Sequence, residues 1–186
     1  MARKTCLILL LSTDKELRYF DDSQMGKVYY VDASQTKEIP NLIEQGPDVL
    51  DEKISLSELQ TRFKPFRGEM KGILTRGAFI SGIGNPYSDE ILFTAQLFPF
   101  RKRTYLKADE VDQLYQTTLS VPKESVAILR DKMGADIHLK IRDFLQVHDK
   151  GGKPCPRCSN SIAAITANRR VTTYCRHCQP GMLLKN

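Results

Sequence analysis

Cys155-Pro156-Arg157-Cys158 and Cys175-Arg176-His177-Cys178 are the parts of the sequence that decide the fold of the C-terminal region. The two Cys-x-x-Cys pairs are separated by 16 residues, which lies within the spacing range of zinc sites built from two such pairs. Four thiolates at tetrahedral corners leave no open position for a reacting water. The sequence therefore predicts one structural Zn²⁺ held by Cys155, Cys158, Cys175 and Cys178. A rubredoxin-like iron site or a redox dithiol is the alternative.

The residues between the two cysteine pairs predict a β-hairpin. Residues 161–167 and 170–174 are rich in Ile, Ala, Val and Thr, and Asn168-Arg169 separates them as a turn. A hairpin attached to a zinc ion would hold Arg169 and Arg170 rigidly at its tip. A groove or a pair of phosphates is the expected target of such a tip.

The net charge of +6 is concentrated in the last part of the chain. Residues 151–186 contain six basic and no acidic side chains, so the preceding 150 residues contain 22 of each sign and are neutral. A purely cationic module favours a polyanion, because each neutralised phosphate releases counterions. A basic tail that only improves solubility is the alternative. The six residues are Lys153, Arg157, Arg169, Arg170, Arg176 and Lys185.

A glycine-rich turn, Gly82-Ile83-Gly84-Asn85-Pro86, precedes a predicted helix. We expect Asn85 at the N-cap and Pro86 at the first helical position. Backbone N–H groups exposed at a helix N-terminus form a site for a phosphate. A plain turn between packed helices, with Asn85 as a cap only, is the alternative.

Helical patterns fill the middle of the chain. Ser55 and Glu58 form a predicted capping box at the start of the first helix, which Pro65 ends. Further helices are expected at about 69–76 and 86–97, and then two separate helices are expected at about 108–119 and 122–133, with Pro122 at the start of the last.

The N-terminal region predicts β-structure. Residues 6–11, 17–20 and 26–31 read as three short strands at the edge of a larger sheet, followed by a linker over 32–54. The apolar run 6–11 is too short for a signal peptide and has no cleavage site after it. No stretch approaches the roughly 20 apolar residues of a spanning helix. We therefore expect no membrane partner, a cytoplasmic location and reduced cysteines that bind metal.

Together these patterns predict an α+β fold in three parts. Residues 1–50 would form strands at the edge of a larger sheet with a linker, 51–148 a helical domain, and 149–186 a β-hairpin zinc ribbon. A monomer is expected.

The turn at residues 82–90 and the ribbon from Cys155 through Gln179 closely resemble the formamidopyrimidine-DNA glycosylase and endonuclease VIII family. The turn resembles that family's helix-two-turn-helix signature, and the ribbon resembles its C-terminal zinc finger. The resemblance covers roughly residues 5–180 and is strongest in these two motifs. Residues 147–152 also resemble the family's linker to the finger, although Asp149-Lys150 replaces a common glycine-arginine pair.

The resemblance implies a set of DNA-binding residues. Asn85, with Gly84 beside it, matches the turn asparagine that grips the backbone next to the lesion, and Arg170 matches the finger arginine that holds the flanking phosphate. Arg169, beside Arg170, and His148, in the linker, complete the expected set. Two grips on one backbone would favour extrusion of a damaged nucleotide. The implied partner is double-stranded DNA with a damaged base or abasic site.

The implied function is base excision repair by a DNA glycosylase of the oxidised-purine and formamidopyrimidine class with AP lyase activity. Members of the family begin with a proline nucleophile and a glutamate, whereas this sequence opens Met1-Ala2-Arg3-Lys4. The resemblance therefore implies that residues 1–50 are a partial β-sandwich, the remnant of an N-terminally truncated catalytic domain with its linker, and that 51–148 are the helix-two-turn-helix DNA-binding domain. We expect no catalytic residue in this chain. The family's Asp-Pro-Arg-Arg-Phe-Gly is replaced by residues 22–26, where Met25 is a candidate apolar plug.

Two other functions remain open. One is a module that binds bent or damaged DNA without chemistry. The other is an RNA-binding or ribosome-associated zinc ribbon, which would prefer folded RNA. If the source is a bacterium, a glycosylase would work at the nucleoid.

Overall fold

The computed structural model describes residues 5–21, 26–40, 42–51, 53–134, 140–167 and 170–181. The chain divides into two compact units, Met1–Ile43 and Glu44–Asn186. The boundaries predicted after residues 50 and 148 stay a prediction.

The N-terminal unit contains an antiparallel hairpin. Strand β1 (Thr5–Leu10) pairs with β2 (Glu16–Phe20), and a 3-10 helix, η1 (Ala33–Glu38), follows. Asp32 caps η1 by accepting a hydrogen bond from the Ser34 amide at 2.8 Å. The two strands expected at 6–11 and 17–20 are confirmed to within one residue at each end.

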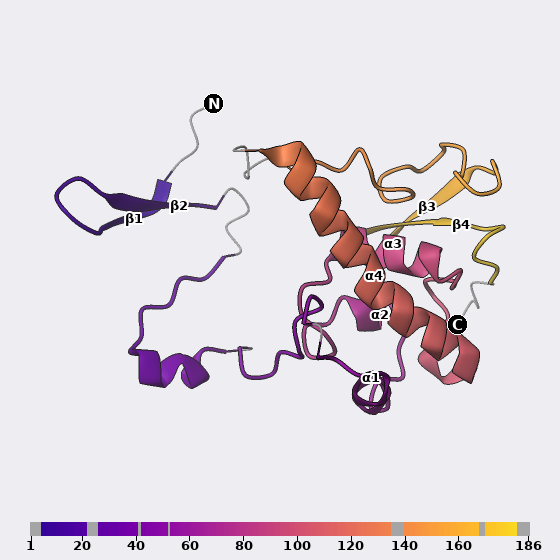
Figure 1. Cartoon of the computed structure of the whole chain (residues 1–186), viewed down its shortest axis with the longest axis horizontal. Helices are drawn as coiled ribbons and strands as arrows, with labels where there is room; N and C mark the ends of the chain where they lie inside the picture. The colour runs from indigo at the N-terminus through magenta and orange to yellow at the C-terminus, as the bar shows by residue number, and fades with distance from the viewer. Residues whose placement is uncertain are drawn as a thin grey trace. The chain divides into compact units, whose positions relative to one another are not determined.

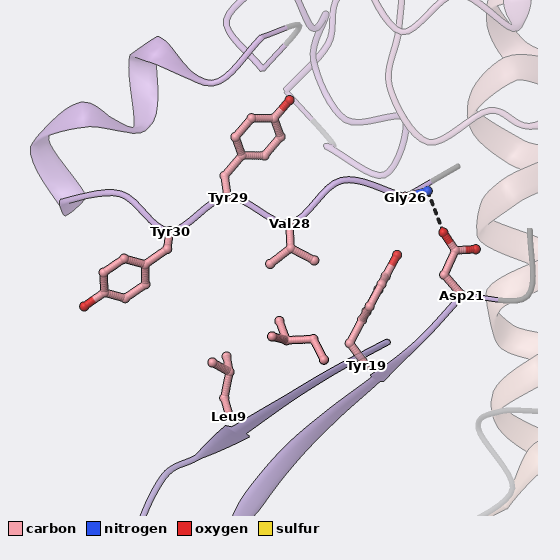
Figure 2. Close-up of a pocket in the computed structure, with 8 residues that line it drawn as sticks. Leu9, Tyr19, Asp21, Gly26, Val28, Tyr29 and Tyr30 are labelled. Atoms are coloured by element: carbon pink, nitrogen blue, oxygen red, sulfur yellow. Dashed lines mark hydrogen bonds between the residues drawn. The ribbon is translucent and has the colours of Figure 1, made fainter. Parts of the chain in front are cut away.

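The third strand expected at 26–31 is wrong, because these residues form no ladder with the hairpin. The amide of Gly26 donates to the Asp21 carboxylate at 2.6 Å and not to a backbone carbonyl of the hairpin. A cavity of about 560 Å³ lies between this segment and the hairpin, and Figure 2 shows Val28 pointing toward the hairpin and Tyr29 pointing away from it. Side chains of this segment and of the hairpin therefore line a cavity, where the predicted third strand would have paired through its backbone.

The C-terminal unit begins with three short helices. They are α1 (Leu56–Phe63), α2 (Met70–Leu74) and α3 (Asn85–Thr94). The Ser55 hydroxyl accepts a hydrogen bond from the Glu58 amide at 3.2 Å, which confirms Ser55 as the N-cap of α1. The Glu58 carboxylate turns to Arg62, one helical turn later.

The two helices expected between 108 and 133 are one helix, α4 (Ala108–Met133), which follows a short 3-10 turn, η2 (Arg103–Tyr105). Pro122 lies inside it, where a proline removes a hydrogen bond at a cost of about 3 kcal/mol. Buried side chains continue on one face across the proline, and burial of this face offsets that cost. They are Leu114, Thr117, Thr118, Val121, Pro122 and Ser125.

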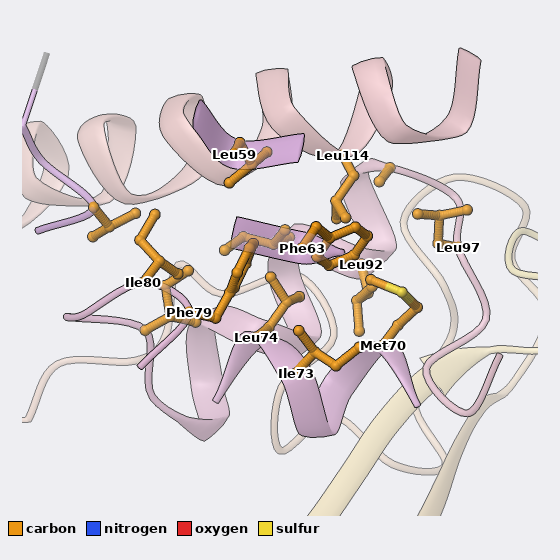
Figure 3. Packing of buried hydrophobic residues seen from close by; sticks show 14 of the residues in the cluster. Leu59, Phe63, Met70, Ile73, Leu74, Phe79, Ile80, Leu92, Leu97 and Leu114 are labelled. Carbon is orange, nitrogen blue, oxygen red and sulfur yellow. The ribbon is translucent and has the colours of Figure 1, made fainter. Parts of the chain in front are cut away.

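These helices enclose the main hydrophobic core. Figure 3 shows Phe63 of α1, Ile73 of α2 and Leu114 of α4 among the side chains that meet there. Phe63 and Phe79 pack at a ring-centroid distance of 5.1 Å. Among the described residues, no helix has the length of apolar sequence that a bilayer crossing requires.

The helix expected at 86–97 is α3, which begins one residue earlier and ends three residues earlier. It closes with a Schellman arrangement in which the Leu97 amide donates to the Leu92 carbonyl and the Gln96 amide to the Phe93 carbonyl. Gln96 takes the left-handed position with φ 57°, where glycine is the usual residue. After this helix end the chain contacts the finger, where the Phe98 and Tyr174 rings pack with centroids 5.4 Å apart.

The predicted zinc-ribbon hairpin is present. Strand β3 (Ile162–Ala167) pairs antiparallel with β4 (Arg170–Cys175), and Ala167 lies opposite Arg170. Helix α3 contacts β4, and Figure 1 shows the hairpin next to that helix. With the helical region, the ribbon confirms the α+β fold.

Candidate nucleic-acid interface

The four predicted cysteine ligands come together. The sulfur atoms of Cys155, Cys158, Cys175 and Cys178 all lie within 4.8 Å of one another. A set of four thiols at this spacing fits a single tetrahedral Zn²⁺, and these cysteines form one structural zinc site. The zinc holds the shape of the ribbon and leaves no coordination position for substrate.

The protein environment separates the acidities of these thiols. The Asn160 side chain donates to Cys158 Sγ at 3.4 Å, and this hydrogen bond lowers the pKa of Cys158 to about 6. Burial raises the pKa of Cys178 to about 12. Zinc binding requires all four sulfurs as thiolates, so it is opposed by the proton on Cys178 and favoured by the lowered pKa of Cys158.

The zinc site is docked on α3. Cys155 and Cys175 form a small core with Phe93, Val147 and Ile162. The metal-binding residues thus share their apolar packing with the helical region.

Two polar side chains hold the finger near the end of α3. The Arg157 guanidinium lies over the Phe93 ring at 4.3 Å and donates to the Phe93 carbonyl at 2.7 Å, which places a cation at the negative end of the helix. Gln179 is fully buried, accepts from the Cys175 amide at 3.0 Å and donates to the Leu97 carbonyl at 2.9 Å. The finger is therefore fixed to the helical region by specific bonds as well as by packing.

The glycine turn differs from the expected cap. Gly84 is the N-cap of α3, Asn85 is its first residue and Pro86 its second, so the assignment of Asn85 to the N-cap is wrong. The Asn85 amide nitrogen instead donates to the Val171 carbonyl on β4 at 2.9 Å. A tertiary hydrogen bond to the finger has replaced the local cap, and the sequence gives no local signal of it.

Asn85 and Arg170 line the same cavity of about 330 Å³. Gly84 is exposed at the helix start, and a Cβ placed on it would find only the Pro86 side chain within 4 Å, at 3.7 Å. Gly82 has φ 90°, a conformation that favours glycine. The other lining residues are Glu69, Lys71, Gly72, Thr75, Phe100 and Thr172.

Lys71 adds a cation to this cavity that sequence reasoning missed. Its ammonium group contacts Asp89 Oδ1 at 2.6 Å and donates to the Val171 carbonyl at 3.0 Å. Burial lowers the pKa of Lys71, against the effect of the nearby Asp89 carboxylate. Lys71 is the one charged residue of the five-residue helix α2, but the sequence does not show that its side chain is buried.

His148 is not on the surface. Its side chain is 4% exposed, and its Nδ1 lies 2.8 Å from Asp89 Oδ2. Its backbone amide donates to Glu90 Oε1 at 2.8 Å, and the Glu90 carboxylate also accepts from the amides of Gln146 and Val147. Because the ring is buried against Asp89, it is not placed at the surface for direct contact with DNA. The hydrogen bonds of His148 hold the linker against α3.

Two predicted positions fall outside the described residues. Arg169, expected beside Arg170 at the hairpin tip, is one, and Met25, the candidate plug, is the other. Their roles stay predictions.

Two family models match the chain. Residues 45–137 match the formamidopyrimidine-DNA glycosylase H2TH domain, and residues 152–181 match the zinc finger found in FPG and IleRS. H2TH is the helix-two-turn-helix motif. The first match covers the helical region with the glycine turn, and the second covers the four cysteines.

Curated relatives are similar over nearly the whole chain. A formamidopyrimidine-DNA glycosylase of Desulfitobacterium hafniense is 32% identical over 184 residues, which cover 95% of this chain and 66% of the relative. One of Thermomicrobium roseum is 34% identical over 172 residues, covering 88% and 58%. The chain thus spans about two thirds or less of the length of these relatives.

Solved structures show the same fold. MutM (Fpg) from Thermus thermophilus is 27% identical with a TM-score of 0.79, and the match covers 92% of this chain and 67% of that one. A MutM in complex with DNA containing carbocyclic 8-oxo-G has a TM-score of 0.79 at 22% identity, covering 91% and 63%.

Proposed function

This chain belongs to the formamidopyrimidine-DNA glycosylase and endonuclease VIII family, and from that membership we propose that it binds double-stranded DNA at a damaged base or an abasic site. The cavity shared by Asn85 and Arg170 carries the proposal. An amide and a guanidinium are both hydrogen-bond donors, and phosphate oxygens are acceptors. Donors from two separate motifs on one concave surface suit two positions on a sugar-phosphate backbone.

Both donors have capacity left for a phosphate. The Asn85 amide nitrogen carries two hydrogens, and the Val171 carbonyl accepts one of them. Arg170 is exposed at the start of β4, and its guanidinium has five N–H donors. The backbone amides of Gly84, Asn85 and Tyr87 add further donors at the positive end of the helix dipole, whereas Pro86 has no N–H and the Ser88 amide donates to the Gly84 carbonyl.

The charge distribution supports the same partner. All six net positive charges lie within residues 151–186, which include the finger, and the rest of the chain is neutral. Arg157 and Gln179 bind the finger to the end of α3 and to the Leu97 carbonyl that follows it, so Arg170 of the finger has a fixed place relative to the helix. The binding energy should therefore depend strongly on salt.

We propose base excision repair as the process. The family-level activity is that of a DNA glycosylase with AP lyase activity on oxidised purines and formamidopyrimidines, and the proposal assigns no catalytic residue within this chain; the alternative is a DNA-binding module without this chemistry. The names of the curated relatives support the glycosylase activity. Solved complexes of similar fold are described as containing an abasic site or a Fapy-dG. The four-thiolate zinc has a structural role in the proposal, and Asn85 and Arg170 hold the substrate.

We further propose that the chain acts as a monomer in the cytoplasm, at the nucleoid in a bacterium.

Binding is tested by fluorescence anisotropy with a duplex that contains a tetrahydrofuran abasic analogue, an intact duplex and a folded RNA as competitor. The proposal predicts preference for the abasic duplex, a steep salt dependence and one protein per duplex by mass photometry. Preference for the folded RNA would contradict it and favour an RNA-binding ribbon.

Chemistry is tested separately by borohydride trapping on a duplex with an 8-oxoguanine or an abasic site. An amine nucleophile that attacks C1' forms an imine, which borohydride reduces to a stable covalent adduct. An adduct supports glycosylase and lyase activity of this chain. Binding without an adduct would instead assign it the function of a DNA-binding module that lacks this chemistry.

A further inference from the structure

The outer edge of strand β4 is completed by side chains of the helical region. Backbone groups of residues two apart in a strand point to the same side, so the Val171 carbonyl and the Thr173 amide share one edge. An open strand edge needs partners for such groups. Here the partners come from α2 and α3.

The donors and the acceptor match this edge. Lys71 Nζ and Asn85 Nδ2 donate to the Val171 carbonyl at 3.0 and 2.9 Å. Asp89 Oδ2 accepts from the Thr173 amide at 3.4 Å and from its hydroxyl at 3.1 Å. The outer edge of β4, the strand that begins with Arg170, is thus hydrogen-bonded to the helical region at Val171 and at Thr173.

Asp89 is the centre of this arrangement. Its carboxylate is fully buried and also contacts Lys71 at 2.6 Å and His148 at 2.8 Å, so one side chain of α3 joins α2, the linker and the finger. A carboxylate near a DNA-binding cavity repels phosphates, and attraction of DNA is therefore no reason for its presence. Its bonds instead fix positions.

We infer that Asp89 is a positioning residue that sets the place of Arg170 relative to Asn85. The inference rests on the proposed DNA-binding function and extends it to a residue that does not touch DNA. Asp89 holds Thr173 directly, and it holds Lys71 against the Val171 carbonyl that Asn85 also binds. With this carboxylate in place, the guanidinium of Arg170 and the amide of Asn85 reach one backbone together.

The test compares Asp89→Asn with Asp131→Asn by anisotropy on the tetrahydrofuran duplex over a salt series. Both changes remove one negative charge, but Asp131 is exposed on α4. General electrostatics predicts equal or tighter binding for both variants. The positioning role predicts that Asp89→Asn alone weakens binding by about tenfold or more and lowers the salt slope by about one, as if the Arg170 contact were lost.

A double-mutant cycle separates positioning from general destabilisation. In an Arg170→Ala background, Asp89→Asn should have little further effect on affinity, since the contact it positions is already gone. Equal losses in both backgrounds, measured on folded protein, would overturn the inference.

A milder pair of variants covers the case in which Asp89→Asn does not fold. Thr173→Val removes only the hydroxyl bond to Asp89, and Thr173→Ser keeps a hydroxyl. Thr173→Val should weaken binding severalfold to about tenfold with a reduced salt slope, and Thr173→Ser should restore both. An unchanged salt slope in Thr173→Val would contradict the inference. Failure of the wild-type chain to bind the abasic duplex would instead contradict the proposed function.

Discussion

The amide nitrogen of Asn85 donates to the carbonyl of Val171, the residue that follows Arg170, at 2.9 Å. The hydrogen bond joins the first turn of α3 to the first residues of β4, although the two lie in different motifs. It explains why Asn85 and Arg170 line one cavity. The start of α3 and the finger therefore contribute side chains to one site.

Substitutions of Asn85 should show this coupling. Asn85→Ala removes the bond to Val171 and one donor to phosphate, and it should weaken binding to the abasic duplex by about tenfold, as expected for one charge-assisted hydrogen bond. Asn85→Asp should be worse, because a carboxylate repels both the Val171 carbonyl and the phosphate. Anisotropy at fixed salt measures both, and a gain in affinity for Asn85→Asp would refute the assignment.

Substitutions of Arg170 separate its charge from its geometry. Arg170→Ala should lower the salt slope by about one unit. Arg170→Lys keeps the charge, and therefore the slope, but loses the planar guanidinium and should bind more weakly than the wild type. A salt titration of both variants tests this. An unchanged slope in Arg170→Ala would remove Arg170 from the interface.

Zinc removal should abolish DNA binding and disorder the hairpin. The finger contributes Arg170, and its small core with Phe93 depends on Cys155 and Cys175. Chelation should remove the zinc, and added Zn²⁺ should restore the affinity. Circular dichroism measures the loss of hairpin structure, and anisotropy measures the loss of DNA binding. Full binding after verified metal removal would contradict the structural role of the zinc.

The zinc affinity should rise with pH. Burial raises the pKa of Cys178 to about 12, so this thiol is protonated at neutral pH and zinc must displace its proton. Burial also raises the pKa of Cys175, and acidification toward the lowered pKa of Cys158, about 6, adds a further competing proton. Calorimetry in two buffers of different ionisation enthalpy should detect proton release, and an affinity that is flat from about pH 6 to 8 would contradict this.

Gln96→Gly should stabilise the C-terminal unit. Gln96 is exposed and has φ 57°, where a side chain costs about 1–2 kcal/mol that glycine avoids. Glycine has more conformational freedom than glutamine in the unfolded chain, and this offsets part of the gain. The free energy of unfolding should therefore rise by about 0.5–1 kcal/mol. Urea denaturation measures it, with Gln96→Ala as the control that should show no gain.

Local patterns in the sequence were enough for the features that depend on local chemistry. The cysteine spacing predicted the zinc site, and Ser55 predicted the start of α1, because ligand spacing and capping involve residues close in the chain. The α+β fold also followed, from the hairpin pattern and the helical periodicity.

The sequence failed where distant contacts decide the structure. Pro122 indicated a helix start, but burial of one continuous face keeps α4 whole. Asn85 indicated a cap, but the finger supplied a tertiary partner. Lys71 and Asp89 are 18 residues apart and form a buried pair that no local pattern signals.

A scan of the DNA backbone tests whether Asn85 and Arg170 bind phosphates of the same strand. Methylphosphonate groups would neutralise one phosphate at a time around a tetrahydrofuran site, and binding would be measured for the wild type, Asn85→Ala and Arg170→Ala. We predict that the wild type is sensitive at phosphates flanking the site on one strand, and that each variant loses sensitivity at a different one of them. Sensitivities that map to opposite strands, or that neither variant changes, would contradict it.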